Sequence, residues 1–66
     1  MKQVYMIERQ DQKYKGVILG TSDEVSSLTS ATVTFDDGTT AIMADQSVAM
    51  CADDGGTRVL YDGEWL

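Results

Sequence analysis

The sequence predicts a small, mainly β protein, either a strongly bent antiparallel sheet or an SH3-like barrel, built from five to six short strands. Three Asp-Gly pairs, Asp37-Gly38, Asp54-Gly55 and Asp62-Gly63, separate short runs of Val, Ile, Thr, Met and aromatic residues. Such pairs between strand-like runs are the strongest short-range signal for β-hairpins. The chain has 66 residues and no proline, so we expect one domain, residues 1–66, with a small core.

The first two strands are predicted at residues 4–7 and 14–19, joined by the polar stretch 9–12. Both runs are rich in β-branched and aromatic side chains, which favours a first hairpin. Gly16 and Gly20 bracket three aliphatic residues, and a glycine inside a strand commonly marks a bulge or a sharp bend. We therefore expect the sheet to curl near these glycines.

The segment 22–28 has the signature of a short helical turn. Thr21 is followed three residues later by Glu24, as in a capping box, and Val25 and Leu28 would share one helical face. An isolated helix this short is marginal. A polar loop rich in Ser and Thr is the alternative interpretation.

From residue 31 onward, the pattern predicts strands that continue to the C-terminus. Apolar and polar residues alternate over 31–35, and the turn at 36–38 leads into a second strand at 39–44. Further strands are predicted at 47–52, 57–61 and 64–66, separated by turns at 45–46, 53–56 and 62–63.

Charge is distributed unevenly along the chain. The net charge is −6, yet four of the five basic residues lie within residues 1–15, whereas nine of the eleven acidic residues follow them. A negative field repels nucleic acid and anionic membranes, and it attracts basic protein surfaces. We therefore expect a protein partner with a basic surface, and no direct binding to nucleic acid or membrane.

The residue types present argue against enzymatic function. The chain has no histidine, which excludes histidine-based acid-base catalysis and Ser-His-Asp triads. Asp36-Asp37 and Asp53-Asp54 lack the spacing of a calcium-binding EF-hand loop. A glycosidase-type pair of carboxylates would need a larger cleft than a chain of this size is expected to form. We predict no catalytic residue, no metal and no cofactor.

Cys51 is the only cysteine, so no disulfide can form within the chain. Its apolar neighbours favour a buried strand residue over a reactive thiol. No apolar run reaches the length of a signal peptide or a membrane span. We therefore expect a protein of the cytoplasm, a reducing compartment.

Candidate partner-binding residues lie in the acidic turns and near the C-terminus. Carboxylates at turn tips would line the rim of the sheet with negative charge. Tyr and Trp are favoured both at core margins and at interface hot spots, so Trp65 either packs as the closing strand or anchors a partner. The candidate set is Asp36, Asp37, Asp53, Asp54, Asp62, Tyr61 and Trp65.

In size, acidity and compactness, the chain resembles the small proteins that bacteriophages and other mobile elements encode against host defence, including anti-CRISPR proteins. The residues quoted for this resemblance are the opening Met1–Ile7 and the closing 62–66. The resemblance implies a non-catalytic inhibitor acting in the host cytoplasm. Many such inhibitors cover a nucleic-acid-binding surface of their target, and some mimic the DNA backbone with carboxylates.

Two other functions are compatible with the sequence. One is an SH3- or Tudor-like adaptor that recognises a peptide or protein through Tyr and Trp side chains. The other is a homo-oligomer whose apolar faces complete one another's cores, which the small size encourages.

Overall fold

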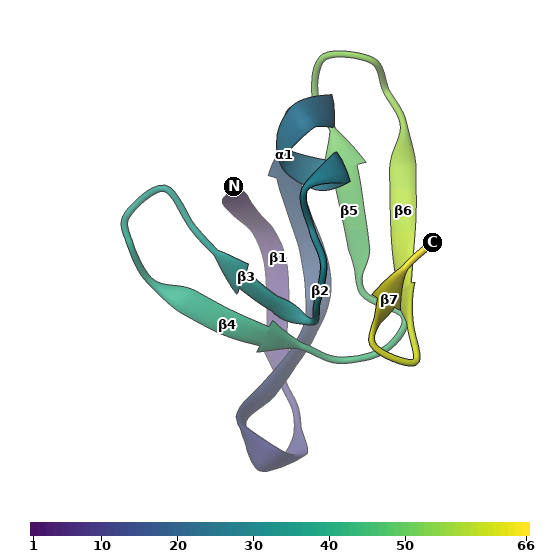
Figure 1. Cartoon of the computed structure of the whole chain (residues 1–66). Coiled ribbons are helices and arrows are strands. Elements are labelled where there is room, and N and C mark those ends of the chain that lie inside the picture. Colours follow the sequence, from purple (N-terminus) through teal and green to yellow (C-terminus); the bar gives the residue numbers. More distant parts are fainter.

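The computed structural model describes all 66 residues, and half of them lie in strands (Figure 1). The predicted mainly β class is confirmed. The elements are β1 (Lys2–Glu8), η1 (Gln10–Gln12), β2 (Lys13–Gly20), α1 (Ser22–Ser26), β3 (Thr32–Thr34), β4 (Thr40–Met43), β5 (Val48–Cys51), β6 (Thr57–Tyr61) and β7 (Glu64–Trp65). The strands number seven when the two-residue β7 is counted and six without it, and β7 lies within the predicted strand at 64–66.

The three Asp-Gly pairs form the predicted turns. Gly38, Gly55 and Gly63 have φ angles of +87°, +72° and +81°, in the left-handed region that glycine adopts without steric cost. Asp62 also has a positive φ, +52°, so both residues of this pair adopt the backbone that a tight hairpin turn requires.

Helix α1 forms where the capping box predicted a helical turn. The N–H of Glu24 donates to Thr21 Oγ1 at 3.3 Å, and the N–H of Thr21 donates to Glu24 Oε1 at 3.0 Å. These bonds satisfy two backbone donors that the helix leaves free. Val25, on the inner side of the helix, is buried.

No helix in the structure is long and apolar enough to cross a membrane.

Strand β2 is the centre of the sheet and has three partners. Strand β1 runs antiparallel along one edge of β2. Along the other edge, Lys13 and Tyr14 pair with β4, and residues 17–20 pair with β5, both in parallel. The sequence predicted antiparallel pairing throughout, which is wrong at these two ladders. Parallel strands need a long crossover, and the segment containing α1 and β3 provides it.

A glycine and a serine occupy the point where β2 changes partner. The N–H of Gly16 donates to Ser47 Oγ at 3.2 Å, and this hydroxyl donates to the carbonyl of Tyr14 at 3.3 Å. Ser47 is fully buried. A β-bulge at Val4 interrupts the β1–β2 register nearby, so the predicted irregularity around Gly16 is confirmed.

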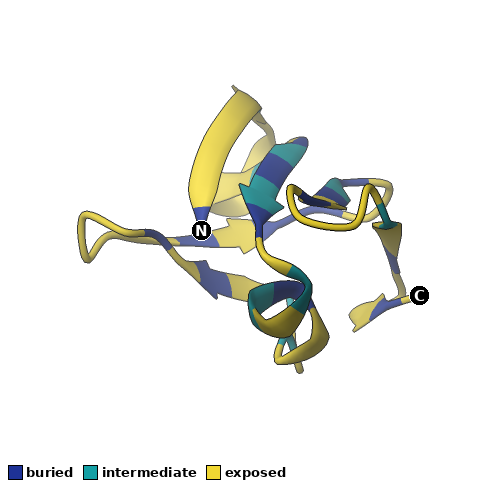
Figure 2. Ribbon diagram, turned by 90° about the horizontal axis from the view of Figure 1, so that it is seen from above, coloured by how far each residue is buried: buried dark blue, intermediate teal, exposed yellow.

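The sheet curls strongly into a half-barrel and encloses the core on its inner side (Figure 2). Trp65 is 7% exposed and belongs to this core, and its Nε1–H donates to the carbonyl of Ser30 at 2.8 Å. The sequence left open whether Trp65 packs in the closing strand or anchors a partner, and its burial shows that it packs in the closing strand. The buried core cluster comprises Met1, Ile18, Val25, Val33, Phe35, Ala41, Met43, Ala49, Cys51, Leu60 and Trp65.

Gly16 is the glycine at which a side chain would do most damage. A Cβ added there would lie 1.9 Å from the carbonyl oxygen of Tyr5, which is backbone and cannot move aside without opening the β1–β2 ladder. We expect Gly16→Ala to lower the free energy of unfolding by about 2–4 kcal/mol, as for other steric clashes in packed interiors.

Gly38→Ala is the matched control, since a Cβ at Gly38 would meet nothing within 4 Å and only its positive φ opposes the change. Its cost should be about 1 kcal/mol. Urea unfolding of both variants measures the difference, and equal losses would contradict the role assigned to Gly16.

Candidate functional site

Helix α1 and the turns that flank it in space, β3–β4 and β5–β6, carry six acidic side chains. In Figure 1, α1 and the β5–β6 turn lie at the top of the molecule, and the β3–β4 turn projects to the left at a lower level. Figure 2 gives the view from above. We call this region the acidic end. It comprises Asp23, Glu24, Asp36, Asp37, Asp53 and Asp54.

A chain of hydrogen bonds connects the three loops. The N-terminal ammonium of Met1 donates to Glu24 Oε2 at 2.9 Å and to Asp36 Oδ1 at 2.7 Å. On the other side of α1, Ser22 donates from its backbone N–H and its hydroxyl to the carboxylate of Asp53, at 2.8 and 2.7 Å. The carboxylates of Glu24, Asp36 and Asp53 therefore hold the acidic end in place.

Asp37 and Asp54 are fixed by bonds within their own turns. Asp37 Oδ1 accepts from the backbone N–H and the hydroxyl of Thr39, at 3.0 and 2.6 Å. Asp54 Oδ1 accepts from the N–H of Gly56 at 2.8 Å. This arrangement is typical of Asp two residues before a turn N–H, so the turn role and the surface charge belong to the same side chains.

Hydrogen bonding keeps two of these carboxylates ionised. The hydroxyl of Thr39, followed by its N–H, lowers the pKa of Asp37. The hydroxyl of Ser22, followed by its N–H, lowers the pKa of Asp53. Donors that favour the charged form stabilise it relative to the neutral acid.

The six carboxylates of the acidic end outnumber the cations near them. These cations are the Met1 ammonium group, Lys2, which lines a hollow together with Asp36 and Asp37, and Arg58, which lines another together with Asp54. Carboxylates accept hydrogen bonds only, and they bind Arg and Lys donors well. No three potential ligands among the Cys, Asp and Glu side chains are grouped closely enough to hold a metal ion.

Four of the five aspartates predicted for the site lie at the acidic end, and Asp62 does not. Asp62 follows β6, whereas Asp54 precedes it, so a strand of roughly 17 Å separates the two turns. Tyr61 is 65% exposed and free to contact a partner. Trp65 is buried, as described above, so it does not present an exposed anchor.

Sequence analysis did not identify the Met1 ammonium, Asp23 or Glu24 as parts of this site. The capping box predicted that Glu24 would lie at the start of the helix. The bond that Glu24 accepts from the Met1 ammonium group, however, joins residues 23 positions apart. No local pattern indicates that the amino group would reach Glu24 and Asp36.

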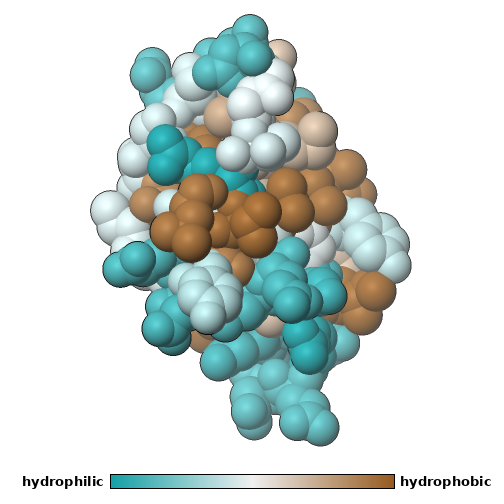
Figure 3. Space-filling view, turned by 90° about the vertical axis from the view of Figure 1, so that its right-hand side faces the viewer, coloured by the Kyte–Doolittle hydropathy of each residue, from teal (hydrophilic) through white to brown (hydrophobic).

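An apolar band lies on a different side of the molecule. Figure 3 looks onto the side of β6 and shows hydrophobic side chains gathered across the middle of this view. Val59 is 44% exposed and Met50 is 41% exposed. Both belong to the outer face of the sheet, because their neighbours along the strands, Ala49, Cys51 and Leu60, are buried in the core.

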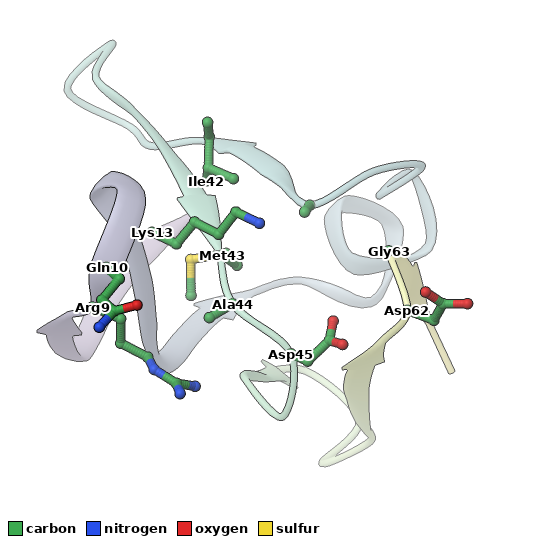
Figure 4. A pocket seen from close by; sticks show the side chains of 10 residues that line it. Arg9, Gln10, Lys13, Ile42, Met43, Ala44, Asp45, Asp62 and Gly63 are labelled. Atoms are coloured by element: carbon green, nitrogen blue, oxygen red, sulfur yellow. The ribbon is translucent and has the colours of Figure 1, made fainter.

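The surface also carries an open groove of about 730 Å³. Arg9, Gln10 and Lys13 lie on one side, Asp45 and Asp62 on the other, and β4 between them (Figure 4). We expected no pocket of this volume from the chain length. The groove forms because projecting turns frame it at the surface, and the small core does not enclose it.

Cys51 occupies the predicted buried strand position. Burial, followed by the nearby carboxylates of Asp54 and Asp53, raises the pKa of its thiol. The thiol is therefore kept in its unreactive, protonated form at neutral pH.

No protein-family model matches the chain, and comparisons with curated proteins and with solved structures found no match. The candidate site consequently stands on its own geometry.

The ion pair at Met1 predicts how stability changes with pH. Asp36, then Glu24, raises the pKa of the N-terminal amine above its usual 8.0. The ammonium group, then the N–H of Thr21, lowers the pKa of Glu24 below its usual 4.5. The pair should contribute fully between about pH 4.5 and 8.0, weakening below as Glu24 protonates and above as the amine loses its proton.

Thermal melts of the chain beginning at Met1, recorded across this pH range, provide the measurement. Glu24→Gln should lower the melting temperature on the plateau and make the alkaline decline shallower than in the wild type. Glu64→Gln, which removes the carboxylate of the exposed first residue of β7, is the control and should leave the profile unchanged. A Glu24→Gln profile parallel to the wild type would contradict the assignment.

Proposed function

We propose that the protein is a non-catalytic inhibitor that binds a protein partner, docking its acidic end on a basic, nucleic-acid-binding surface of that partner. The single observation that carries this proposal is the concentration of six carboxylates on three hydrogen-bonded loops at one end of a small domain. A surface of this kind presents fixed negative charges, as a nucleic acid backbone does.

The rigidity of these carboxylates favours binding. Asp37, Asp53 and Asp54 are held by bonds to neighbouring donors, so little side-chain freedom remains to be lost on association. Concentrated charge of one sign also accelerates encounter with an oppositely charged surface and makes it sensitive to salt.

The resemblance to phage-encoded anti-defence inhibitors, including anti-CRISPR proteins, supports the same proposal through size and charge. Such an inhibitor acts in the cytoplasm of the host cell. Its target would be a nucleic-acid-binding protein or complex whose binding surface the acidic end covers as a mimic of DNA.

A second candidate function is an adaptor that binds a peptide or protein through aromatic side chains. It is favoured by Tyr61, which is 65% exposed, and by Tyr5, which is 58% exposed. Binding of this kind depends on aromatic contact area and little on salt, which separates it from the first candidate.

The triple variant Asp23→Asn/Asp37→Asn/Asp54→Asn tests the proposal while sparing the bonds that join the loops. An Asn side chain keeps the oxygen that accepts from Thr39 and Gly56. Partner binding should weaken about ten-fold or more, since each surface charge contributes on the order of 0.5 kcal/mol.

The matched control, Asp11→Asn/Asp45→Asn/Asp62→Asn, removes the same charge away from the acidic end. Asn tolerates the positive φ of Asp11 and Asp62. Each immobilised protein is incubated with bacterial lysate at low and high salt, with duplex DNA as competitor, and bound proteins are identified by mass spectrometry. We expect DNA and salt to displace a basic protein that the control retains and the acidic-end variant loses. Equal retention by a folded acidic-end variant would exclude the proposal.

A further inference from the structure

A row of apolar side chains crosses the outer face of the sheet. Its members, each opposite the next in the neighbouring strand, are Tyr5, Val17, Val48, Val59 and Leu66. Residues opposite one another in adjacent strands share a face of the sheet. The row therefore begins on β1, crosses β2, β5 and β6, and ends at the residue that follows β7. Through Val59 it belongs to the apolar band of Figure 3.

No part of the chain covers this row. Tyr5, Val59 and Leu66 are 58%, 44% and 66% exposed. The only α-helix, α1, packs on the inner side of the sheet, where its Val25 joins the core. A sheet with one face in water normally carries polar side chains on that face, and exposed apolar patches commonly mark sites of interaction. The outer face therefore has the character of an interface.

Two opposite charges flank the row on its outer face. Lys15, in β2, precedes Val17 by two residues, and Glu64, in β7, precedes Leu66 by two residues, so both side chains project from the same face as the row. β2 is parallel to β5, and β6 is antiparallel to both β5 and β7. β2 and β7 therefore run in the same direction, and Lys15 and Glu64 lie at the same level along the strands.

These features make the outer face complementary to itself. If a two-fold axis runs parallel to the strands between β5 and β6, β5 of each copy lies over β6 of the other, and β2 lies over β7. Val48 then lies over Val59 of the other copy, and Lys15 lies over Glu64. Rotation about such an axis leaves each residue at its level along the strands, so both kinds of pair form together. A second copy of the chain thus matches both the apolar row and its charges.

The spacing of packed sheets allows the charged pairs to form. Sheets packed face to face lie about 10 Å apart and cross at about 30°. β2 and β7 are one and a half strand spacings, about 7 Å, from the axis. The crossing angle therefore displaces each pair by about 4 Å along the strands. Extended Lys and Glu side chains together span this separation.

The charges also select this axis over two others. An axis along β5 itself would place Glu64 over Ile7 of the other copy, since Ile7 lies opposite Lys15 on β1, and would leave Lys15 without an anion. An axis perpendicular to the strands would place β2 over β2, so Lys15 could not reach Glu64. Only the axis between β5 and β6 pairs the two charges.

The carboxylates of the β5–β6 turn do not oppose this arrangement. Asp53 bonds to Ser22 of α1, on the inner side of the sheet, and Asp54 bonds to the N–H of Gly56 within the turn. Between the two copies these groups are separated by at least the spacing of packed sheets, about 10 Å. The Debye length at physiological ionic strength is about 8 Å, so their repulsion is largely screened.

We propose that two copies of the chain form a symmetric dimer through their outer faces, with β2, β5, β6 and β7 of each copy in contact. The interface is isologous, because the same residues contribute from each copy. The arrangement is that of an aligned β-sandwich, in which two sheets bury their apolar faces against each other. The dimer does not depend on the function proposed for the acidic end.

Sedimentation equilibrium at physiological salt, over about a thousand-fold range of concentration, measures the association. We expect the mass to rise from 7.2 kDa towards twice that value. V59K should abolish the rise, because it places a cation at the centre of the interface. I42K is the matched control: Ile42 is also 44% exposed but lies on β4, outside the row, and this variant should dimerise normally.

A charge exchange tests the pairing itself. K15E and E64K should each weaken dimerisation about ten-fold or more, since each places like charges together at two symmetry-related sites. In a K15E–E64K dimer both sites again hold opposite charges, so an equimolar mixture should associate about as tightly as the wild type.

Two controls change the net charge equally on the inner face. R58E matches K15E, because Arg58 lies opposite the buried Ala49, and E8K matches E64K, because Glu8 lies opposite Tyr14, which packs on the core. Both should dimerise as the wild type does. Circular dichroism melts at the dilute end of the range, where the chain is monomeric, establish that each variant is folded.

Three results would overturn the proposal. The first is a wild-type chain that stays monomeric over the whole range, which would leave the outer face for another protein. The second is a folded V59K that dimerises as the wild type does. The third is a mixture of folded K15E and E64K that associates no better than either variant alone.

Discussion

The fold depends on strand β2, one edge of which pairs with two different strands. β2 pairs with β4 through its first two residues and with β5 through its last four, so the ladder must be interrupted between them. Ser47 occupies that gap and bonds to Gly16 and Tyr14. A buried hydroxyl there satisfies backbone groups that would otherwise lack partners, and the absence of a Cβ at Gly16 lets β1 approach from the other side.

Local features of the fold could be predicted because short-range chemistry determines them. The Asp-Gly turns, the capping box at Thr21 and the alternation over 31–35 each depend on residues a few positions apart. The parallel ladders of β2 could not be predicted in this way. Each strand-forming segment of the sequence is compatible with parallel or antiparallel pairing. The direction of pairing depends on how the α1 segment crosses the sheet and where Ser47 and Gly16 meet.

The candidate site, like the fold, could be predicted from the sequence only in part. The turn positions of Asp36, Asp37, Asp53 and Asp54 followed from sequence, but their gathering at one end did not, because it depends on the curl of the sheet. Asp62 has the same turn chemistry and lies elsewhere. Met1 could not be assigned to the site, since its partners are 23 and 35 positions away.

The partner change of β2 also has a consequence for the order of folding. The β1–β2 hairpin joins neighbouring residues and can form early, whereas the other edge of β2 remains open until residues 40–51 are present. Contacts between distant residues slow folding because a long loop must close first. During synthesis, a nascent chain that has not reached β5 therefore carries an exposed apolar strand, and this interval is when aggregation competes most with folding.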